Sequence, residues 1–468
     1  MSSLCETDVS LGQTVFGHAE LGDRRRTARL VTTFDLMQKH PGGTLPDKLA
    51  SPADLRAFYR LCDCEEVTHA ALLAAARQHT LTKIADCPGP VLILHDATEL
   101  DYTSLESLAG DLGQIGKGSG RGYVCQNVLA VAADTGEVLG LMDQILHHRD
   151  EVSEDETLTE LRERETRESL LWIHGTKNLP ADAKLIDVAD RGADTFEFLE
   201  HESKSSRRFV IRACKVRKVY AGHEPVGPRR YLKEYLGSLP ELGRFTMKVQ
   251  AQAGRKARKK AEFIVRGGSL LVCPPHAKHG HHGNEPLPLF VVQVIEVNPP
   301  AGEKAIEWTL LTNESVRGFQ DAWRVVDWYE RRWIIEEFHK AKKTGCRIED
   351  MQFTSLDRLE PAIALVSLVA VTLLNLRDAS RRPDAKTRRA TSIMAADYVK
   401  VLSTWRYRNS KEGMTVHEFF YALARLGGHQ NRKSDGQPGW LVLWRGWTKL
   451  QAMLDGYDVA RRTRCGKT

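Results

Sequence analysis

The amino-acid sequence predicts an α/β protein whose mixed sheet is flanked by helical regions at both ends of the chain. Helix-period patterns fill about residues 10–86 and the region after Leu356, whereas short apolar strands alternate with helices between them. Val128–Ala133 and Val138–Leu146 flank a turn at residues 134–136, a pattern typical of a β-hairpin. At 468 residues the chain is long enough for two or three domains with their own cores.

These patterns divide the chain into three regions. Residues 1–88 are predicted to form a helical domain, residues 89–355 an α/β core, and residues 356–468 a second helical domain that begins with a long helix over Leu356–Arg381. A β-rich insertion is expected in the core at about residues 207–312. Its predicted strands are Phe209–Arg212, Arg244–Val249, Glu262–Arg266, Ser269–Val272, Leu289–Val297 and Trp308–Leu311.

The composition is that of a soluble globular protein, with 42% hydrophobic and 27% charged residues and a net charge of +6. Residues 151–168 are dominated by acids and residues 207–266 by bases, an asymmetry that suits a polyanion-binding surface. The nine cysteines form no CxxC pair, which favours reduced thiols in a cytoplasmic setting. The longest apolar run, Ala362–Leu374, is shorter than a membrane span, so no membrane association is expected.

A cluster of arginines begins an N-terminal helix. Asp23 is the predicted N-cap, and Arg25, Arg26 and Arg29 occupy the first turns. Cations at this end oppose the helix dipole, so helix stability does not account for them. Contact with phosphates would account for them, and a solvated basic face is an equal alternative.

Three carboxylates lie at positions where a site could form, two at the ends of strands and one on a helix. Asp96 follows the short strand Val91–Leu94, Asp190 ends the strand Leu185–Asp190, and Glu336 lies on a late helix. Sites in α/β sheets form at strand ends, and three carboxylates can hold divalent ions about 4 Å apart for phosphoryl transfer. Asp187 competes with Asp190 for this role, but its odd offset puts it on the other face of the sheet. Mg²⁺ is the predicted ion because oxygen ligands and phosphate substrates suit it, with Mn²⁺ as a substitute.

Glu336 belongs to a stretch, YERRWIIEEFHKAKK, that lacks Gly and Pro and is predicted to form one helix over Tyr329–Lys343. At about 100° per residue, one face collects a carboxylate, cations and a tyrosine within roughly 80°. These residues are Tyr329, Arg332, Glu336, Lys340 and Lys343. A solvated charged face is the alternative. Trp333 is interpreted as a core residue or a DNA wedge, and His339 as a packing or supporting residue.

Two further segments carry weaker signals. The basic turn at residues 254–260 suits DNA contact or a solvated loop. The segment CPPHAKHGHHGNEP contains Cys273, His276, His279, His281 and His282, but its Gly and Pro content fixes no metal geometry. A loop that touches DNA is therefore preferred over a metal site.

The spacing of Tyr329, Arg332, Glu336 and Lys343 matches the Y-(2)-R-(3)-E-(6)-K signature, and the chain resembles DDE transposases of the insertion-sequence-four family. The likeness extends over nearly the whole chain. It includes FGHAELGDRRRTARL at residues 16–30, Asp96 in LHDATELDY, Asp190 in VADRGAD, Trp308 in WTLLTN, and ARLGG…WLVLWRGWTKLQ near the end.

The resemblance implies an RNase H-like catalytic core with a β-rich insertion, an N-terminal DNA-binding domain and a C-terminal dimerisation domain. It implies that Asp96, Asp190 and Glu336 bind metal, and that Tyr329, Arg332 and Lys343 hold phosphates near a flipped base on which Trp308 stacks. The implied partners are double-stranded transposon ends, target DNA and a second copy of the chain, in the bacterial cytoplasm at the nucleoid. The implied reaction is nicking, a DNA hairpin intermediate, hairpin opening and strand transfer.

One departure concerns the family's Arg-x-Lys motif, which appears here as Arg212-Ala213-Cys214 with Lys215 one place late. This departure casts doubt on one of the expected contacts with the DNA hairpin. Two other functions remain open from sequence: a catalytically silent DNA-binding regulator, and a structure-specific DNA nuclease that performs no strand transfer.

Overall fold

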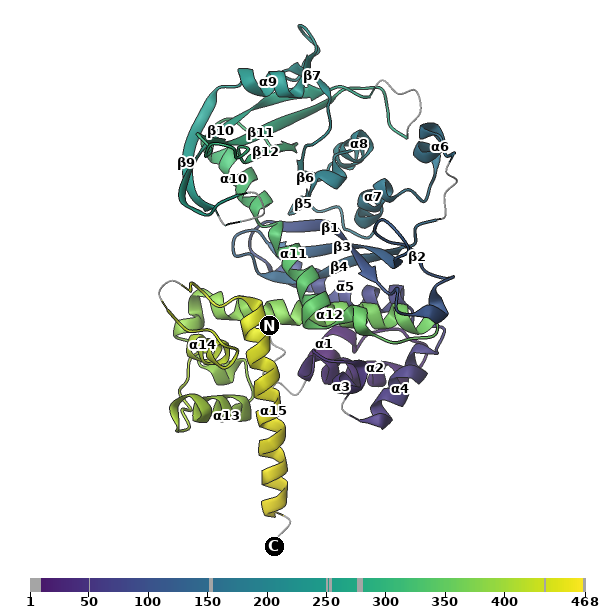
Figure 1. Cartoon of the computed structure of the whole chain (residues 1–468), viewed down its shortest axis with the longest axis vertical. Coiled ribbons are helices and arrows are strands. Elements are labelled where there is room, and N and C mark those ends of the chain that lie inside the picture. The colour runs from purple at the N-terminus through teal and green to yellow at the C-terminus, as the bar shows by residue number, and fades with distance from the viewer. Residues whose placement is uncertain are drawn as a thin grey trace.

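The computed structural model describes residues 10–49, 51–150, 155–249, 251, 255–275, 281–432 and 435–465. It is a mixed α/β structure built around one large mixed sheet, with helical regions at both ends of the chain (Figure 1). The predicted fold class is confirmed at this level.

The N-terminal region consists of helices with polar caps. Asp23 caps α2 and Ser51 caps α4 through their side chains, as the sequence indicates. The apolar faces of these helices share a core that includes Phe16, Phe34 and Phe58. The helices are α1 (Leu11–Phe16), α2 (Arg24–Lys39), α3 (Leu45–Leu49), α4 (Pro52–Cys62) and α5 (His69–Asp86).

The central part of the sheet has the order β4-β3-β1-β5-β6. The strands β4, β3 and β1 pair antiparallel, whereas β1, β5 and β6 run parallel to one another. Their bounds are β1 (Val91–Asp101), β3 (Arg121–Ala132), β4 (Val138–His147), β5 (Leu185–Ala189) and β6 (Arg208–Arg212), and the short β2 (Gly113–Gln114) pairs with β3. The predicted hairpin is confirmed as β3 and β4. The helices α6 (Leu158–Glu163), α7 (Leu171–Thr176) and α8 (Phe196–Lys204) connect the later strands.

The β-rich stretch continues the same sheet, because β12 pairs antiparallel with β6. The chain order of this part is β7 (Lys218–Ala221), β8 (Arg230–Tyr231), α9 (Leu232–Ser238), β9 (Glu241–Val249), β10 (Arg258–Val272), β11 (Leu287–Val297) and β12 (Glu307–Thr312). The two strands predicted on either side of Gly267-Gly268 are one continuous strand, β10, since β11 pairs along it through both glycines. Arg258, assigned to a basic turn from sequence, begins this strand and pairs with Glu296 and Glu303. Gly254 of that turn lies outside the described residues.

The long helix α12 (Leu356–Arg381) has the predicted bounds and lies between the sheet and both helical regions (Figure 1). It is long and apolar enough to cross a membrane by length and composition, yet 83% of its most apolar window is buried within the chain. Burial against the protein's own core accounts for that composition. The chain ends with α13 (Ala396–Tyr407), α14 (Val416–Leu426) and α15 (Trp440–Cys465).

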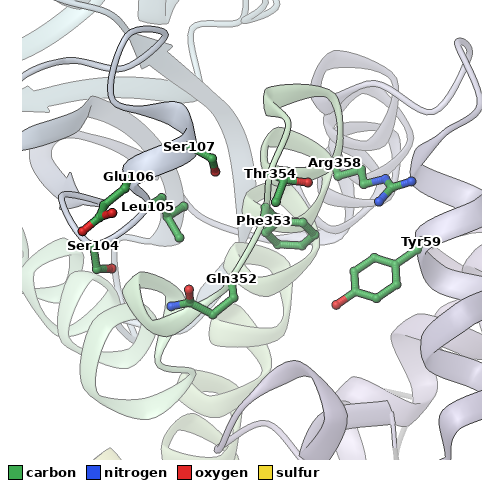
Figure 2. Close-up of a pocket in the computed structure, with 9 residues that line it drawn as sticks. All are labelled: Tyr59, Ser104, Leu105, Glu106, Ser107, Gln352, Phe353, Thr354 and Arg358. Carbon is green, nitrogen blue, oxygen red and sulfur yellow. The ribbon is translucent and has the colours of Figure 1, made fainter.

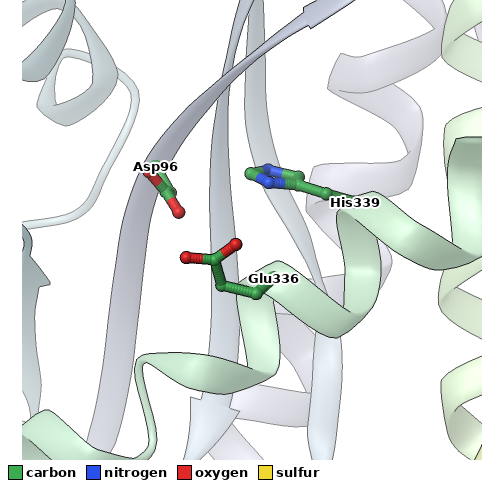
Figure 3. A group of neighbouring side chains, drawn as sticks. All are labelled: Asp96, Glu336 and His339. Carbon is green, nitrogen blue, oxygen red and sulfur yellow. The ribbon is translucent and has the colours of Figure 1, made fainter. Parts of the chain in front are cut away.

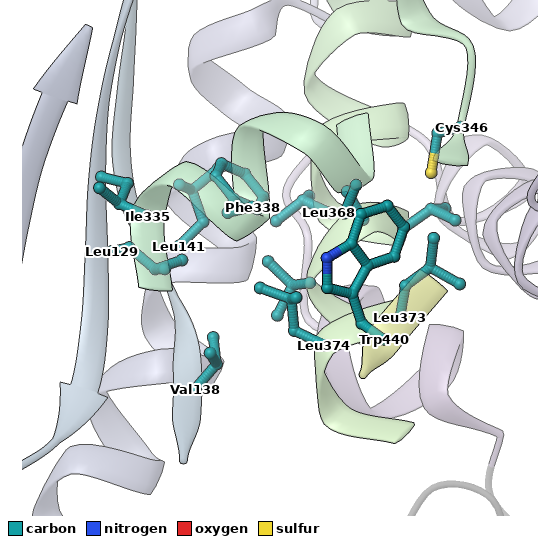
Figure 4. Packing of buried hydrophobic residues seen from close by; sticks show 14 of the residues in the cluster. Leu129, Val138, Leu141, Ile335, Phe338, Cys346, Leu368, Leu373, Leu374 and Trp440 are labelled. Carbon is teal, nitrogen blue, oxygen red and sulfur yellow. The ribbon is translucent and has the colours of Figure 1, made fainter. Parts of the chain in front are cut away.

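The core between the sheet and α12 also holds the helix that carries Glu336. Ile335 and Phe338 are fully buried and lie beside Leu129 and Leu141 of the sheet (Figure 4). Trp440 of α15 packs on the other side of the cluster, near Leu373 and Leu374. The apolar face of this helix therefore fixes which of its side chains face the sheet edge where the carboxylates lie.

Candidate carboxylate site

Asp96 and Asp190 are neighbours because of the register between β1 and β5. The last pair of this parallel ladder is His95↔Ala189, so each aspartate is the next residue along its strand. Neighbouring strands lie about 4.8 Å apart, which brings the two carboxylates to one place. The expectation that Asp96 ends a strand is wrong: β1 continues to Asp101, because β3 pairs along its whole length. What ends at His95 is the pairing with β5.

Glu336 reaches the same place from a helix that is shorter than predicted. The expected single helix over Tyr329–Lys343 is broken into α10 (Phe319–Glu330), α11 (Trp333–Lys340) and a π-helical turn (Ala341–Gly345). Arg331 and Arg332 form the turn between α10 and α11. No Gly or Pro marks this break, which is why periodicity alone missed it.

Arg332 links the two acids that lie closest to it. Its Nη1 donates to Asp96 Oδ2 at 2.9 Å, and its Nη2 donates to Glu336 Oε1 at 3.1 Å. Arg332 and Asp96 are 236 positions apart in the chain, so only the fold brings them together. The side chains of Arg332 and Asp96 are only 14% and 13% exposed, which strengthens this ion pair relative to one in open water.

The electrostatics of the cluster act most strongly on Asp96. Burial, together with the negative charges of Asp190 and Glu336, raises the pKa of Asp96 to about 7, while the positive charge of Arg332 acts in the opposite direction. Asp190 and Glu336 therefore both lie close enough to influence Asp96. A carboxylate that is buried beside other acids is costly to ionise, and a nearby cation lowers that cost.

His339 is a member of the cluster that the sequence interpretation left as a packing or supporting residue. Ligand atoms of Asp96, Glu336 and His339 all lie within 4.8 Å of one another (Figure 3). The position of His339, three residues after Glu336 on a helix, was the signal that it shares that face. Asp190 is not part of this closest group.

A buried polar network orients His339. Asn127 Nδ2 lies 3.2 Å from His339 Nε2, while Asn127 Oδ1 accepts hydrogen bonds from Lys342 at 2.9 Å and Gln144 at 2.8 Å. With its oxygen occupied, the Asn127 amide must donate toward the ring. Burial, together with Lys342, Lys343 and Arg332, lowers the pKa of His339 well below its usual range, so the ring is neutral at pH 7.

This donor set fits a divalent cation. The carboxylates of Asp96 and Glu336 converge, and a third carboxylate lies within electrostatic reach. The neutral His339 ring, whose Nε2 accepts from Asn127, lies beside them as a positioning group. The raised pKa of Asp96 marks a place where a positive charge would be stabilised. Of the residues predicted to bind metal, Asp96 and Glu336 both belong to the group whose ligand atoms lie within 4.8 Å of one another.

The residues predicted to contact DNA are arranged around α11. The rings of Trp308 and Tyr329 meet edge to face with centroids 5.9 Å apart, although the Tyr329 side chain is itself buried. Trp333 is 53% exposed and is therefore not a core residue, and Lys340 Nζ lies 5.0 Å from the centre of its ring. Lys343 pairs with Glu349 at 2.9 Å.

The remaining residues predicted to contact DNA lie earlier in the sequence. Arg212 lies at the end of β6 and donates to the backbone oxygen of Glu307, directly before Trp308. In the N-terminal region, Arg25 pairs with Asp23, Arg26 with Glu66 and Arg29 with Asp54. Of these three arginines, Arg25 is the most exposed, with 91% of its side chain accessible.

Asp187, the rival of Asp190, is sealed on the opposite face of the sheet. It accepts a hydrogen bond from His95 at 2.6 Å and pairs with Arg207 at 2.7 Å, and it is fully buried. Burial opposes ionisation here, but the contacts with His95 and Arg207 hold the pKa of Asp187 below its usual value. A carboxylate so fully engaged is unavailable to a ligand.

Other candidate sites lie elsewhere. His276 and His279 fall outside the described residues, while His282 contacts the ring of Phe196 and the backbone oxygen of Gly283. A pocket of about 340 Å³ lies where α4 meets the loop after β1 and the segment before α12 (Figure 2). Its lining includes Tyr59, Glu106 and Arg358, and it shares no residue with the carboxylate cluster.

Residues 12–67 match a family model described as transposase DNA-binding. The match covers helices α1–α4, including the arginines of α2. It identifies this region as a DNA-binding module of the transposase class. The chain is thus supported as a DNA-binding transposase, with DNA as its partner.

Proposed function

We propose that this protein is a cut-and-paste DNA transposase that uses Asp96, Asp190 and Glu336 for phosphoryl transfer. The observation that carries the proposal is the convergence of these acids, from two strands and a distant helix, in a chain whose N-terminal region matches a transposase DNA-binding module. The strand order β4-β3-β1-β5-β6 supports an RNase H-like core. Asp96 and Asp190 lie at adjacent positions of that order.

The chain's own groups would act as follows. Asp96 and Glu336 would hold Mg²⁺, or Mn²⁺ in its place, with Asp190 completing the acidic set. Such ions supply activation of water or a 3′-hydroxyl and stabilisation of the leaving oxygen. Arg332 would exchange its carboxylate partners for a DNA phosphate, and Lys340 and Lys343 would add positive charge beside it. His339, held by Asn127, would keep Glu336 and Asp96 in position.

The aromatic residues support a hairpin route. Trp308 and Tyr329 already lie against each other near Arg332, and exposed Trp333 projects from the start of α11. Such rings can stack on or wedge beside an extruded base at a bent DNA end. We further propose that two copies of the chain assemble on the paired transposon ends through the C-terminal helices, before the ends are joined to target DNA in the bacterial cytoplasm.

The test uses the element's own terminal repeats, which flank the gene. Labelled end DNA incubated with the protein and Mg²⁺ should give nicked and hairpin products on a denaturing gel, and joined products when target DNA is added. Glu336→Gln should abolish all of these while leaving the gel shift of end DNA unchanged. Glu412→Gln, at an exposed site on the far helical region, is the matched control and should cleave normally.

Two outcomes would replace the proposal. A shifted but uncut complex with the wild-type protein would indicate a silent DNA-binding regulator. Cleavage without joined products would indicate a nuclease. Cleavage that survives Glu336→Gln would exclude this acid from the chemistry.

A further inference from the structure

A strongly basic hairpin projects from the far end of the sheet. The basic hairpin, residues 214–233, comprises β7, β8 and the residues next to them, and β7 pairs with β10 at one end of the sheet order (Figure 1). It carries one acid, Glu224, against six bases. These bases are Lys215, Arg217, Lys218, Arg229, Arg230 and Lys233.

The cations of this hairpin differ from those elsewhere in their partners. Within the described part of the chain, only Arg217 of the six forms an ion pair with a carboxylate, that of Asp194. By contrast, Arg25, Arg26 and Arg29 of α2 each have an acidic partner. Exposed like charges held together repel one another, so their concentration here calls for an external anion.

The hairpin surface is held in shape. Lys218 Nζ lies 5.7 Å from the centre of the Tyr231 ring, and the guanidinium of Arg229 lies 5.4 Å from that of Tyr220. The Arg229 side chain also donates to the Tyr220 hydroxyl at 2.7 Å. These contacts restrict two long side chains before any ligand binds.

The base of the hairpin is tied to the carboxylate site. Asp194, four positions after Asp190, is fully buried and accepts hydrogen bonds from the backbone nitrogens of Cys214 at 2.6 Å and Lys215 at 2.7 Å. It also pairs with Arg217. The loop that positions Asp190 therefore also sets where the basic hairpin begins.

We propose that the basic hairpin binds the phosphate backbone of duplex DNA, as a second contact beyond the carboxylate site. The inference rests on the proposed function only in taking DNA as the substrate. Unpaired, pre-positioned cations suit the regular array of phosphates along a duplex. The competing explanation is that the bases and Pro228 merely protect the edge strand β8 from pairing with another chain.

The test is the salt dependence of duplex binding without metal. Anisotropy of a labelled duplex of unrelated sequence, in EDTA, would be measured for the full chain across a range of salt concentrations. The test variant carries Lys215→Gln, Lys218→Gln, Arg229→Gln and Arg230→Gln. The matched control removes the same charge from exposed positions of the C-terminal region, through Lys386→Gln, Lys411→Gln, Arg432→Gln and Arg461→Gln.

The slope of log affinity against log salt should fall in magnitude by about 2 to 4 in the test variant, at roughly 0.9 per phosphate contact, and by less than about 1 in the control. Restoring Lys215 and Lys218 as arginines should recover about half of that fall, and this second variant guards against a folding defect. An unchanged slope in the test variant would overturn the proposal. If the test variant also self-associates by light scattering, the edge-protection explanation would replace it. A loss of affinity confined to single-stranded DNA would overturn the proposal too. Because no cleavage is measured, these outcomes are independent of the Glu336 experiment.

Discussion

Two charged clusters occupy opposite faces of the same two strands, and they differ in how far their charges are buried. The open cluster, Asp96, Asp190, Arg332, Glu336 and His339, crowds negative charge at the sheet edge and leaves it partly exposed. The sealed cluster, His95, Asp187, Glu202 and Arg207, is almost wholly buried.

Adjacent residues of β1 belong to different clusters, since His95 and Asp96 point to opposite faces. In the sealed cluster, hydrogen bonds and ion pairs satisfy Asp187 within the chain. In the open cluster, one arginine serves two acids and the pKa of Asp96 rises. The difference teaches that the sealed charges hold the strands together, while the open charges remain available to a ligand.

The largest expected effect separates activity from stability. Glu336→Gln should lower Mg²⁺-dependent cleavage by at least about 10³-fold, equivalent to roughly 4 kcal/mol of barrier, because an amide is a poor metal ligand. Its free energy of unfolding, measured with urea, should stay within about 1 kcal/mol of wild type. A comparable loss of stability would show that the open cluster is structural after all.

The reverse result is expected in the sealed cluster. Asp187→Asn keeps the shape but leaves Arg207 buried beside a neutral partner, so unfolding free energy should fall by about 3–5 kcal/mol in urea titrations. Asp111→Asn, at an exposed carboxyl, is the control and should change it by no more than about 0.5 kcal/mol. Full stability in Asp187→Asn would remove the contrast between the two faces.

The pKa of Asp96 predicts a pH-dependent affinity of the open cluster for metal. A proton competes with the cation below about pH 7, so Mn²⁺ affinity measured by electron paramagnetic resonance should rise about tenfold per pH unit up to that value and then level off. Asp96→Asn should bind weakly with a much flatter profile. A wild-type Mn²⁺ affinity that stays constant between about pH 5.5 and pH 7 would contradict the raised pKa of Asp96.

The smallest expected effect concerns Glu202. Burial and the charge of Asp187 raise the pKa of Glu202 well above its usual value, which favours its neutral form in the folded chain. Its favourable contribution is present at acidic pH and is lost as pH rises above the unfolded pKa of about 4.3 toward the folded value. Glu202→Gln should therefore gain thermal stability over wild type by a few degrees more at pH 8 than at pH 5. If the gain in thermal stability is the same at pH 5 and pH 8, Glu202 is ionised in the folded chain instead.

Most secondary structure could be read from the chain, but the end of β1, the break before α11 and the continuity of β10 could not. The helix α12 and the hairpin β3–β4 follow from long, regular patterns. The break at Arg331–Arg332 contains no Gly or Pro, and Arg332 there contacts Asp96 of β1 as well as Glu336 of α11. The strand β10 was predicted as two strands because Gly267 and Gly268 have a weak strand propensity. Pairing with β11 overrides this propensity and keeps the strand continuous.

The signature around Arg332 was noticed through the resemblance to a known family. The sequence by itself predicted acids suited to a metal site, Asp96, Asp190 and Glu336, and it set Asp187 aside by its offset along the strand. These follow from residue type and from periods of two and about 3.6, which are local properties. Only the tertiary structure decided that His339 joins the acids, that Arg332 bridges two of them, and that the basic hairpin is anchored through Asp194. Those contacts join residues that are distant in the chain or separated by a turn. They depend on sheet register and core packing, which no local pattern encodes.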